Sequence, residues 1–278
     1  MSLSCTFILS SAEEKKCQYI RSCFEQRAPG RQLGVRRLAH DGFRPPTFEE
    51  FSTVNLAGAL RLTLAYALHD PSTLLPHRTI PTLLSLPLPI GPSLPTKPRI
   101  RAIVLDKDNT ICPPETANVH QAYLSKVEKI RESSEFSQNA HSILIVSNTA
   151  GSSSAPEHEA EAKQLELELG LPVLRQHPDR KKPLCGSDIL RYFKDHGVTE
   201  DPKEIVVVGD RLATDVLVAR EMGSWSVWCR DGWRNPEMPG RDYRGFFSKM
   251  EHRFERIMRG GLGRTAPPPK TALQFEKP

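Results

Sequence analysis

Short apolar runs that alternate with helical stretches constrain the fold of this chain more than any other feature. Continuous β-branched and aliphatic runs are typical of strands that are buried on both faces of a parallel sheet. Their alternation with helices predicts an α/β fold in three layers, with helices on both sides of a Rossmann-like parallel sheet. The predicted strands cover residues 100–105, 142–146, 171–174, 205–208 and 224–229, and the predicted helices residues 118–132, 156–169, 186–196 and 213–222.

The first predicted strand ends in two aspartates, Asp106 and Asp108, with Lys107 between them. Side chains two positions apart on an extended segment project to the same side, so we expect both carboxylates to face one pocket and Lys107 to point away. Two carboxylates this close repel each other and require a cation, a shared proton or a division of roles. Mg²⁺ suits such hard oxygen ligands.

Regions outside the predicted sheet have a different character. Residues 1–50 carry arginines typical of a mitochondrial targeting segment, but their acidic residues favour simple disorder. Residues 51–97 form an apolar helical candidate followed by a proline-rich linker, too short to span a bilayer. This segment either lies in a membrane interface or packs against the domain, and the sequence leaves both interpretations open. The domain itself is predicted over residues 98–259, with a disordered tail at 260–278.

Charge and cysteine content exclude few functions. The 278-residue chain has a net charge of +5, which is compatible with anionic lipid, nucleic acid or a phosphorylated substrate. Its six cysteines include no Cys-x-x-Cys pair, so a disulfide framework or a zinc site is not expected. The basic, amphipathic helix predicted at 241–259 either docks its apolar face on the domain or contacts an anionic membrane.

Four polar signals follow strands or lie in strand-to-helix loops. In chain order they are Asp106-x-Asp108-x-Thr110, Ser147-Asn148, Lys182-Pro183 and Gly209-Asp210-x-x-x-x-Asp215. Each pair alone is common, and Ser147 or Asn148 could simply cap a helix. Together, and in this order, they resemble the motifs of the haloacid dehalogenase-like (HAD) phosphohydrolases.

The resemblance implies a role for each residue. Asp106 would be the nucleophile that forms an aspartyl-phosphate, and Asp108 the general acid and base. The phosphate would be bound by Ser147, Asn148 and Lys182. Lys181 is the competing candidate, and Lys182 is favoured because the lysine of the family commonly precedes proline.

The same resemblance implies a Mg²⁺ site. Its ligands would be the Asp106 carboxylate, the backbone carbonyl of Asp108 and the Asp210 carboxylate. Asp215 would lie outside the coordination shell of the metal, or contact the metal through a water molecule. Thr110 with Asn109 would shape the turn that holds the first two carboxylates.

Short gaps between the motifs leave no room for a cap domain, so an open site and a large or surface-bound substrate are expected. Over about residues 50–260, the Leu-Asp-Lys-Asp-Asn-Thr motif, the Arg-Lys-Lys-Pro loop and the stretch 207–216 resemble fungal and plant mitochondrial phosphatidylglycerophosphate (PGP) phosphatases.

That narrower resemblance implies a phospholipid substrate, hydrolysis of PGP on the route to cardiolipin, and peripheral binding to anionic lipid at the matrix face of the inner mitochondrial membrane. No nucleic-acid partner is expected, and the oligomeric state is left open. The alternatives are a phosphatase for a soluble phosphomonoester or phosphoprotein, a receiver-like module that keeps its phosphate, and an inactive scaffold. Asp108 argues against the receiver-like module, because dephosphorylation needs this second carboxylate.

Overall fold

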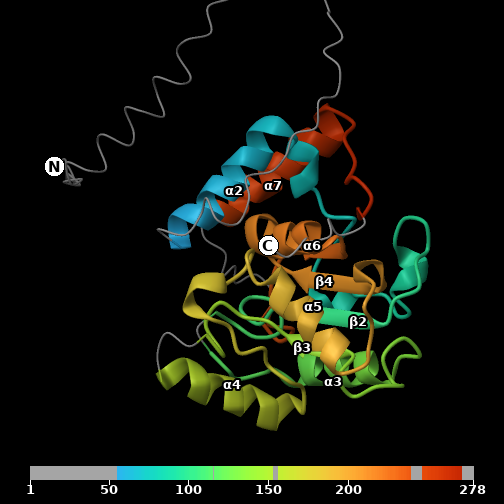
Figure 1. Cartoon of the computed structure of the whole chain (residues 1–278), viewed down its shortest axis with the longest axis vertical. Coiled ribbons are helices and arrows are strands. Elements are labelled where there is room, and N and C mark those ends of the chain that lie inside the picture. Colours follow the sequence, from blue (N-terminus) through green and yellow to red (C-terminus); the bar gives the residue numbers. More distant parts are fainter. Residues whose placement is uncertain (1–54, 115, 153–155, 239–245, 271–278) are drawn as a thin grey trace, which may run out of the picture. The chain divides into compact units, whose positions relative to one another are not determined.

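Five parallel strands form one sheet in the order β1-β5-β4-β2-β3 (Figure 1). This computed structural model describes residues 55–114, 116–152, 156–238 and 246–270. The strands are β1 (Arg78–Ile80), β2 (Ala102–Leu105), β3 (Ile143–Ile145), β4 (Ile205–Gly209) and β5 (Trp225–Cys229). Every residue of β2 to β5 is buried, which explains their continuous apolar sequence. The predicted α/β fold with a parallel sheet is confirmed. The predicted strand at 171–174 is reduced to a single bridge from Val173 to Ile145.

Helices cover both faces of the sheet. The alternate residues Ala102 and Val104 of β2 pack in one apolar cluster with α5 (Gly186–Asp195) and α6 (Leu217–Met222). Ile103 and Leu105 face the other way, into a cluster with α3 (Gln121–Glu132) and α4 (Pro156–Leu169). Because successive side chains on a strand point to opposite faces, this division produces the three layers.

The proline-rich part of the segment 51–97 packs against the sheet domain. Leu83, Leu86 and Ile90 are at most 2% exposed and belong to the main core. They lie near two short turns, η3 (Leu83–Ser85) and η4 (Gly91–Ser93), while η2 (Pro71–Leu74) precedes β1. Since β1 pairs in parallel with β5, the sheet also includes a strand from before the predicted boundary at residue 98.

Two helices far apart in sequence lie side by side, α2 (Asn55–His69) and α7 (Phe246–Arg256), the latter extended by η8 (Ile257–Gly261) (Figure 1). Leu62 of α2 and Phe254 of α7 share an apolar cluster with Leu217 of α6. Within the described ranges, no helix has the length and apolar character needed to cross a bilayer.

The predicted tail at 260–278 includes residues that contact the domain. The ring nitrogen Nε2 of His77 lies 3.0 Å from the carbonyl oxygen of Pro267, and Arg220 donates to the carbonyl oxygen of Pro268 at 3.3 Å. The predictions for residues 1–50 and 271–278 fall outside the described residues. The remaining short turns are η5 (Pro178–Arg180), η6 (Pro202–Glu204) and the π-helical turn η7 (Leu212–Val216).

Candidate active site

A hollow of about 180 Å³ opens at the carboxyl ends of the central strands. Asp106 follows β2 and Asp210 follows β4, and these strands are neighbours in the sheet. Ligands in parallel α/β sheets bind at this end, so the location is the expected one. The residues that line it are Asp106, Asp108, Pro114, Asn148, Thr149, Lys182, Asp210, Arg211, Thr214 and Asp215.

Lys182 joins two buried carboxylates in the hollow. Its ammonium group contacts Asp106 Oδ1 and lies 2.6 Å from Asp215 Oδ1. The other oxygen of Asp106 accepts a hydrogen bond from the Thr110 hydroxyl at 3.2 Å. Thr110 is itself fully buried, so it holds the Asp106 carboxylate from within the turn. Lys181 does not line the hollow.

Gly209 permits the close approach of Asp215. A Cβ atom at position 209 would lie 2.3 Å from the carboxyl carbon of Asp215, closer than any real contact. The backbone N–H of Arg211 donates to Asp215 Oδ2 at 3.1 Å. Because Gly209 has no side chain, Asp215 of η7 can pack against the end of β4.

Asp210 is held by a second set of contacts. Asn109 Nδ2 donates to Asp210 Oδ2 at 2.6 Å, and the Trp228 indole donates to the Asp210 carbonyl oxygen at 2.8 Å. Asn109 has a φ of +60°, a left-handed conformation that asparagine tolerates better than most residues. Gly232 leaves room for it, because a Cβ there would lie 2.4 Å from Asn109 Nδ2.

Asp108 is oriented by three side chains. Its Oδ2 accepts hydrogen bonds from Ser147 Oγ at 3.2 Å and Thr149 Oγ1 at 2.8 Å. Its Oδ1 lies 2.8 Å from the ammonium group of Lys107. Asp106 and Asp108 both line the hollow, as the alternation of the strand predicts.

Asn148 connects the second and third motifs. Its amide oxygen accepts from the Lys182 backbone N–H at 2.9 Å, and its amide nitrogen donates to the Lys182 carbonyl at 3.3 Å. Ser147 is fully buried behind the hollow and does not line it. The predicted phosphate-binding residues therefore lie together, with Asn148 and Lys182 at the surface of the hollow and Ser147 behind Asp108.

Burial shapes the proton affinities of the site. Burial raises the pKa of Asp106 to about 8, opposed by Lys182 and reinforced by Asp215 and Asp210. Burial, followed by repulsion from Asp215, raises the pKa of Asp210 to about 7. Burial alone would lower the pKa of Lys182, but Asp106 and Asp215 raise it above its ordinary value. The lysine is therefore charged, while the carboxylates need further positive charge to ionise fully.

The carboxylates fit a divalent cation. Asp106, Asp210 and Asp215 each offer an oxygen, and these atoms lie within 4.8 Å of one another. The three carboxylates exceed the buried ammonium of Lys182 by two negative charges (−3 + 1 = −2), and the Arg211 guanidinium approaches Asp210 only to 3.9 Å. Hard oxygen donors with this excess charge suit Mg²⁺. Asp215, which is predicted to act outside the metal shell, offers an oxygen atom within the same distance limit.

The sequence had assigned no functional role to three residues at the site, Lys107, Thr149 and Arg211. Lys107 does point away from the hollow, as predicted, yet it contacts the Asp108 carboxylate and also Glu161 of α4. Thr149 follows the Ser-Asn pair and could have been found as a further hydroxyl of that loop. Arg211 lies next to Asp210 and lines the hollow.

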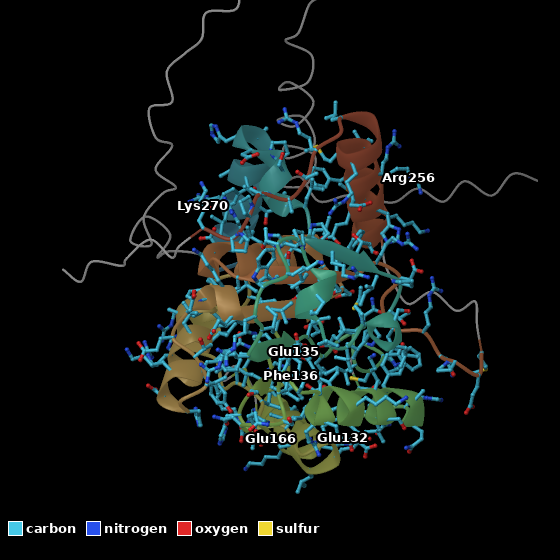
Figure 2. All side chains as sticks on the ribbon, turned by 90° about the vertical axis from the view of Figure 1, so that its right-hand side faces the viewer. Glu132, Glu135, Phe136, Glu166, Arg256 and Lys270 are labelled. Atoms are coloured by element: carbon cyan, nitrogen blue, oxygen red, sulfur yellow. The ribbon has the colours of Figure 1, made fainter. Side chains whose placement is uncertain are left out.

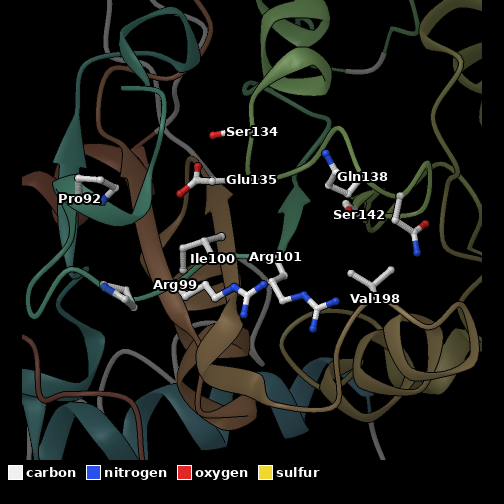
Figure 3. A pocket seen from close by; sticks show the side chains of 11 residues that line it. Pro92, Arg99, Ile100, Arg101, Ser134, Glu135, Gln138, Ser142 and Val198 are labelled. Carbon is white, nitrogen blue, oxygen red and sulfur yellow. The ribbon is translucent and has the colours of Figure 1, made fainter.

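A larger hollow, of about 450 Å³, lies at the opposite ends of the strands (Figure 3). It is lined by Arg99, Arg101, Gln138 and Ser142, with Glu135 as its acidic residue. Both oxygens of Glu135 already accept backbone N–H groups, from Ile90 at 2.5 Å and Gly91 at 2.8 Å. Since Glu135 is the one carboxylate among the described residues of this lining, the smaller hollow is the candidate active site.

Comparison with known proteins places the chain in a family. The family model for mitochondrial PGP phosphatase matches residues 58–234. The mitochondrial phosphatidylglycerophosphatase GEP4 of Saccharomyces cerevisiae is 45% identical over 179 residues, covering 64% of this chain and 89% of that protein. A probable mitochondrial phosphatidylglycerophosphatase of Schizosaccharomyces pombe is 31% identical, covering 60% of this chain and 79% of its own length.

A solved structure described as a HAD-like phosphatase, from Mesorhizobium loti, overlaps 58% of this chain and 88% of its own, with 18% identity and a TM-score of 0.34. A TM-score of 0.34 is too low to support the assignment. The family match extends over more than half of the chain and includes every motif of the hollow. This chain therefore belongs to the mitochondrial PGP phosphatase family and is a phosphoric monoester hydrolase.

Proposed function

We propose that this chain hydrolyses PGP to phosphatidylglycerol in a Mg²⁺-dependent reaction that passes through an aspartyl-phosphate on Asp106. The observation that carries the proposal is the contact of Lys182 with Asp106 on the floor of an acidic hollow, in a chain of this family. A positive charge fixed beside a carboxylate allows that carboxylate to receive a phosphate group without strong repulsion.

In the first step Asp106 attacks phosphorus, and the bond from phosphorus to the glycerol oxygen breaks. Asp108, which lines the same hollow, donates a proton to the departing glycerol oxygen. In the second step Asp108 takes a proton from water, which attacks the phosphorus and releases inorganic phosphate from Asp106. Lys107, Ser147 and Thr149 hold the Asp108 carboxylate for both transfers.

Lys182 and Asn148 line the same hollow and bind the oxygens of the transferring phosphate. Mg²⁺, held by Asp106, Asp210 and the backbone carbonyl of Asp108, supplies positive charge that offsets the excess negative charge of the carboxylates. Because burial raises the pKa values of Asp106 and Asp210, this charge also favours the ionised nucleophile.

The outer surface of α7 supports a peripheral contact with anionic lipid. Lys249, Arg253 and Arg256 follow the helical spacing i, i+4 and i+7, and all three are exposed. Figure 2 shows Arg256 at the outer side of the helix. Met250 and Ile257 are 52% and 49% exposed, and Leu64 and Leu68 of the neighbouring helix α2 are 50% and 80% exposed. Basic and apolar side chains on adjoining helices suit the surface of an anionic bilayer.

We place this contact at the matrix face of the inner mitochondrial membrane, in keeping with the mitochondrial relatives. Replacing Lys249, Arg253 and Arg256 by glutamine should weaken cosedimentation with phosphatidylglycerol-containing vesicles by at least 10-fold, since each basic residue near such a surface contributes about 1 kcal/mol. Equal binding of the wild type and this variant would refute the assigned surface.

The substrate assignment is tested with PGP in mixed micelles and with soluble phosphate esters, each with and without Mg²⁺. We expect PGP to be preferred and its turnover to require Mg²⁺. Asp106→Asn should form no phosphoenzyme, whereas Asp108→Asn should accumulate it, because the first step precedes the need for a base. A preference for soluble esters or phosphopeptides would instead assign the alternative function, a phosphatase for soluble phosphomonoesters or phosphoproteins.

A further inference from the structure

Arg211 is the solvent-exposed cationic residue of the hollow. Among the described residues, two lysine or arginine side chains line the hollow, Lys182 and Arg211. Lys182 is nearly buried and engaged by two carboxylates, whereas the Arg211 side chain is 63% exposed. Its one ion pair among the described residues is a loose contact of 3.9 Å from Nε to Asp210 Oδ1. The outer nitrogens of the guanidinium group are therefore available at the rim.

The backbone fixes where this side chain begins. The Arg211 N–H donates to Asp215 Oδ2, and its carbonyl oxygen accepts from the Asp215 N–H at 3.0 Å. The base of the side chain is thus held at the start of η7, directly beside the floor of the hollow. The guanidinium can reach a group just outside the hollow while the floor holds the reacting phosphate.

The proposed substrate carries two phosphates. The terminal phosphate is a monoester and is removed, while the inner one is a diester that links the headgroup glycerol to the lipid. When the terminal phosphate occupies the floor, a glycerol unit places the inner diester toward the opening. An anion there faces several carboxylates and needs a cation beside it, which a guanidinium supplies through paired hydrogen bonds.

We propose that Arg211 is a specificity-determining residue that binds the second, non-reacting phosphate of the substrate. The inference rests on the proposed function, because it assigns a position to the inner phosphodiester of PGP. Binding energy from a part of the substrate that does not react favours the correct substrate over smaller phosphate esters. Arg211 then distinguishes a substrate with two phosphates from one with a single phosphate.

Two water-soluble substrates test this without interference from membrane binding. One is the deacylated headgroup, glycerophosphoglycerophosphate, which keeps both phosphates, and the other is glycerol 3-phosphate, which has one. The quantity to measure is the ratio of their kcat/KM values, at saturating Mg²⁺. In Arg211→Gln this ratio should fall about 10- to 100-fold, the range expected for hydrogen bonds to a charged group. Arg211→Lys should restore part of it, because the point charge remains.

Arg180→Gln is the matched control, since it removes the same charge from a residue that does not line the hollow. Its ratio should equal that of the wild type. An equal fall for both substrates in Arg211→Gln would mean that the residue acts through Asp210, and an unchanged ratio would mean no role in selection; either result overturns the inference. A wild type that hydrolyses neither PGP nor its deacylated headgroup would instead defeat the proposed function itself.

Discussion

Lys107 and Lys182 are both buried lysines beside the end of β2, and each lies between two carboxylates. Lys107 contacts Asp108 and Glu161, and Lys182 contacts Asp106 and Asp215. Their side chains are 0% and 3% exposed, yet Lys182 lines the hollow and Lys107 does not. Both lysines are therefore buried beside carboxylates, and they differ in that the ammonium group of Lys182 reaches the hollow.

The count of hydrogen-bond donors explains the difference. An ammonium group has three N–H bonds. Lys107 uses them on Asp108, on Glu161 and on the carbonyl oxygen of Thr116 at 3.1 Å. Lys182 has two partners within the described part of the chain, so one N–H remains for a phosphate oxygen. Lys107 thus braces Asp108, whereas Lys182 is equipped to bind a ligand.

The largest expected effect is on stability, in Lys107→Met. Removing a lysine from a buried ion pair deprives the Asp108 and Glu161 carboxylates of this positive charge, and such changes cost about 3–5 kcal/mol. Urea unfolding should show this loss of free energy of unfolding. Lys163→Met, on the exposed side of α4, should change it by less than about 0.5 kcal/mol. Equal stability of the two variants would show that Lys107 does not have the structural role assigned to it.

The second effect is on catalysis, in Lys182→Met. Losing a fixed positive charge beside the transferring phosphate should lower kcat/KM for a soluble aryl phosphate about 100- to 1,000-fold. Steady-state assays on protein shown to be folded by circular dichroism measure this loss. Lys181→Met removes the neighbouring lysine, which does not line the hollow, and should retain activity within about twofold. The comparison would break if Lys181, and not Lys182, were the lysine whose loss stops turnover.

The smallest effect concerns His77, a partly buried base whose hydrogen-bond partners in the described part of the chain, Ser226 and Pro267, include no carboxylate. Its Nδ1 accepts from the Ser226 backbone N–H at 3.0 Å, and its Nε2 faces the Pro267 carbonyl. Burial, with Arg220 and Arg259 nearby, lowers the pKa of His77 to about 4. The unfolded chain then binds a proton at higher pH than the folded chain, so this stability is complete above about pH 6.5 and is lost as the pH falls toward 4.

We expect the free energy of unfolding to fall by about 2–3 kcal/mol from this group between pH 7 and pH 4. Comparing urea unfolding of the wild type and His77→Gln at both pH values isolates this contribution, because the variant lacks it. If His77→Gln had the same pH dependence as the wild type, burial without a carboxylate would not lower the stability of the folded chain in acid. The contrast between His77 and the two lysines would then fail.

Local sequence predicted the sheet and the approximate position of the carboxylates. The strand predicted at 205–208 is observed at 205–209, and the helix predicted at 156–169 has those bounds. The proximity of Asp106 and Asp210 could be predicted from the sequence, because parallel strands end at the same edge of a sheet. The sequence did not predict the ion pairs of Lys107 with Asp108 and Glu161. The alternation of side chains concerns only the strand, whereas Glu161 comes from α4, which is distant in the sequence.

The sequence by itself determined the parallel sheet, the order of its motifs and the chemical character of the site, since continuous apolar strands and their polar ends are local features. The tertiary structure decided which lysine keeps a free N–H and that Leu83, Leu86, Ile90 and Leu94 belong to the core. It also decided that α2, α6 and α7 share one apolar cluster and that Arg211 stands exposed beside the hollow. These properties depend on burial and on partners distant in the chain, which change the proton affinity and accessibility of a side chain without altering its local pattern.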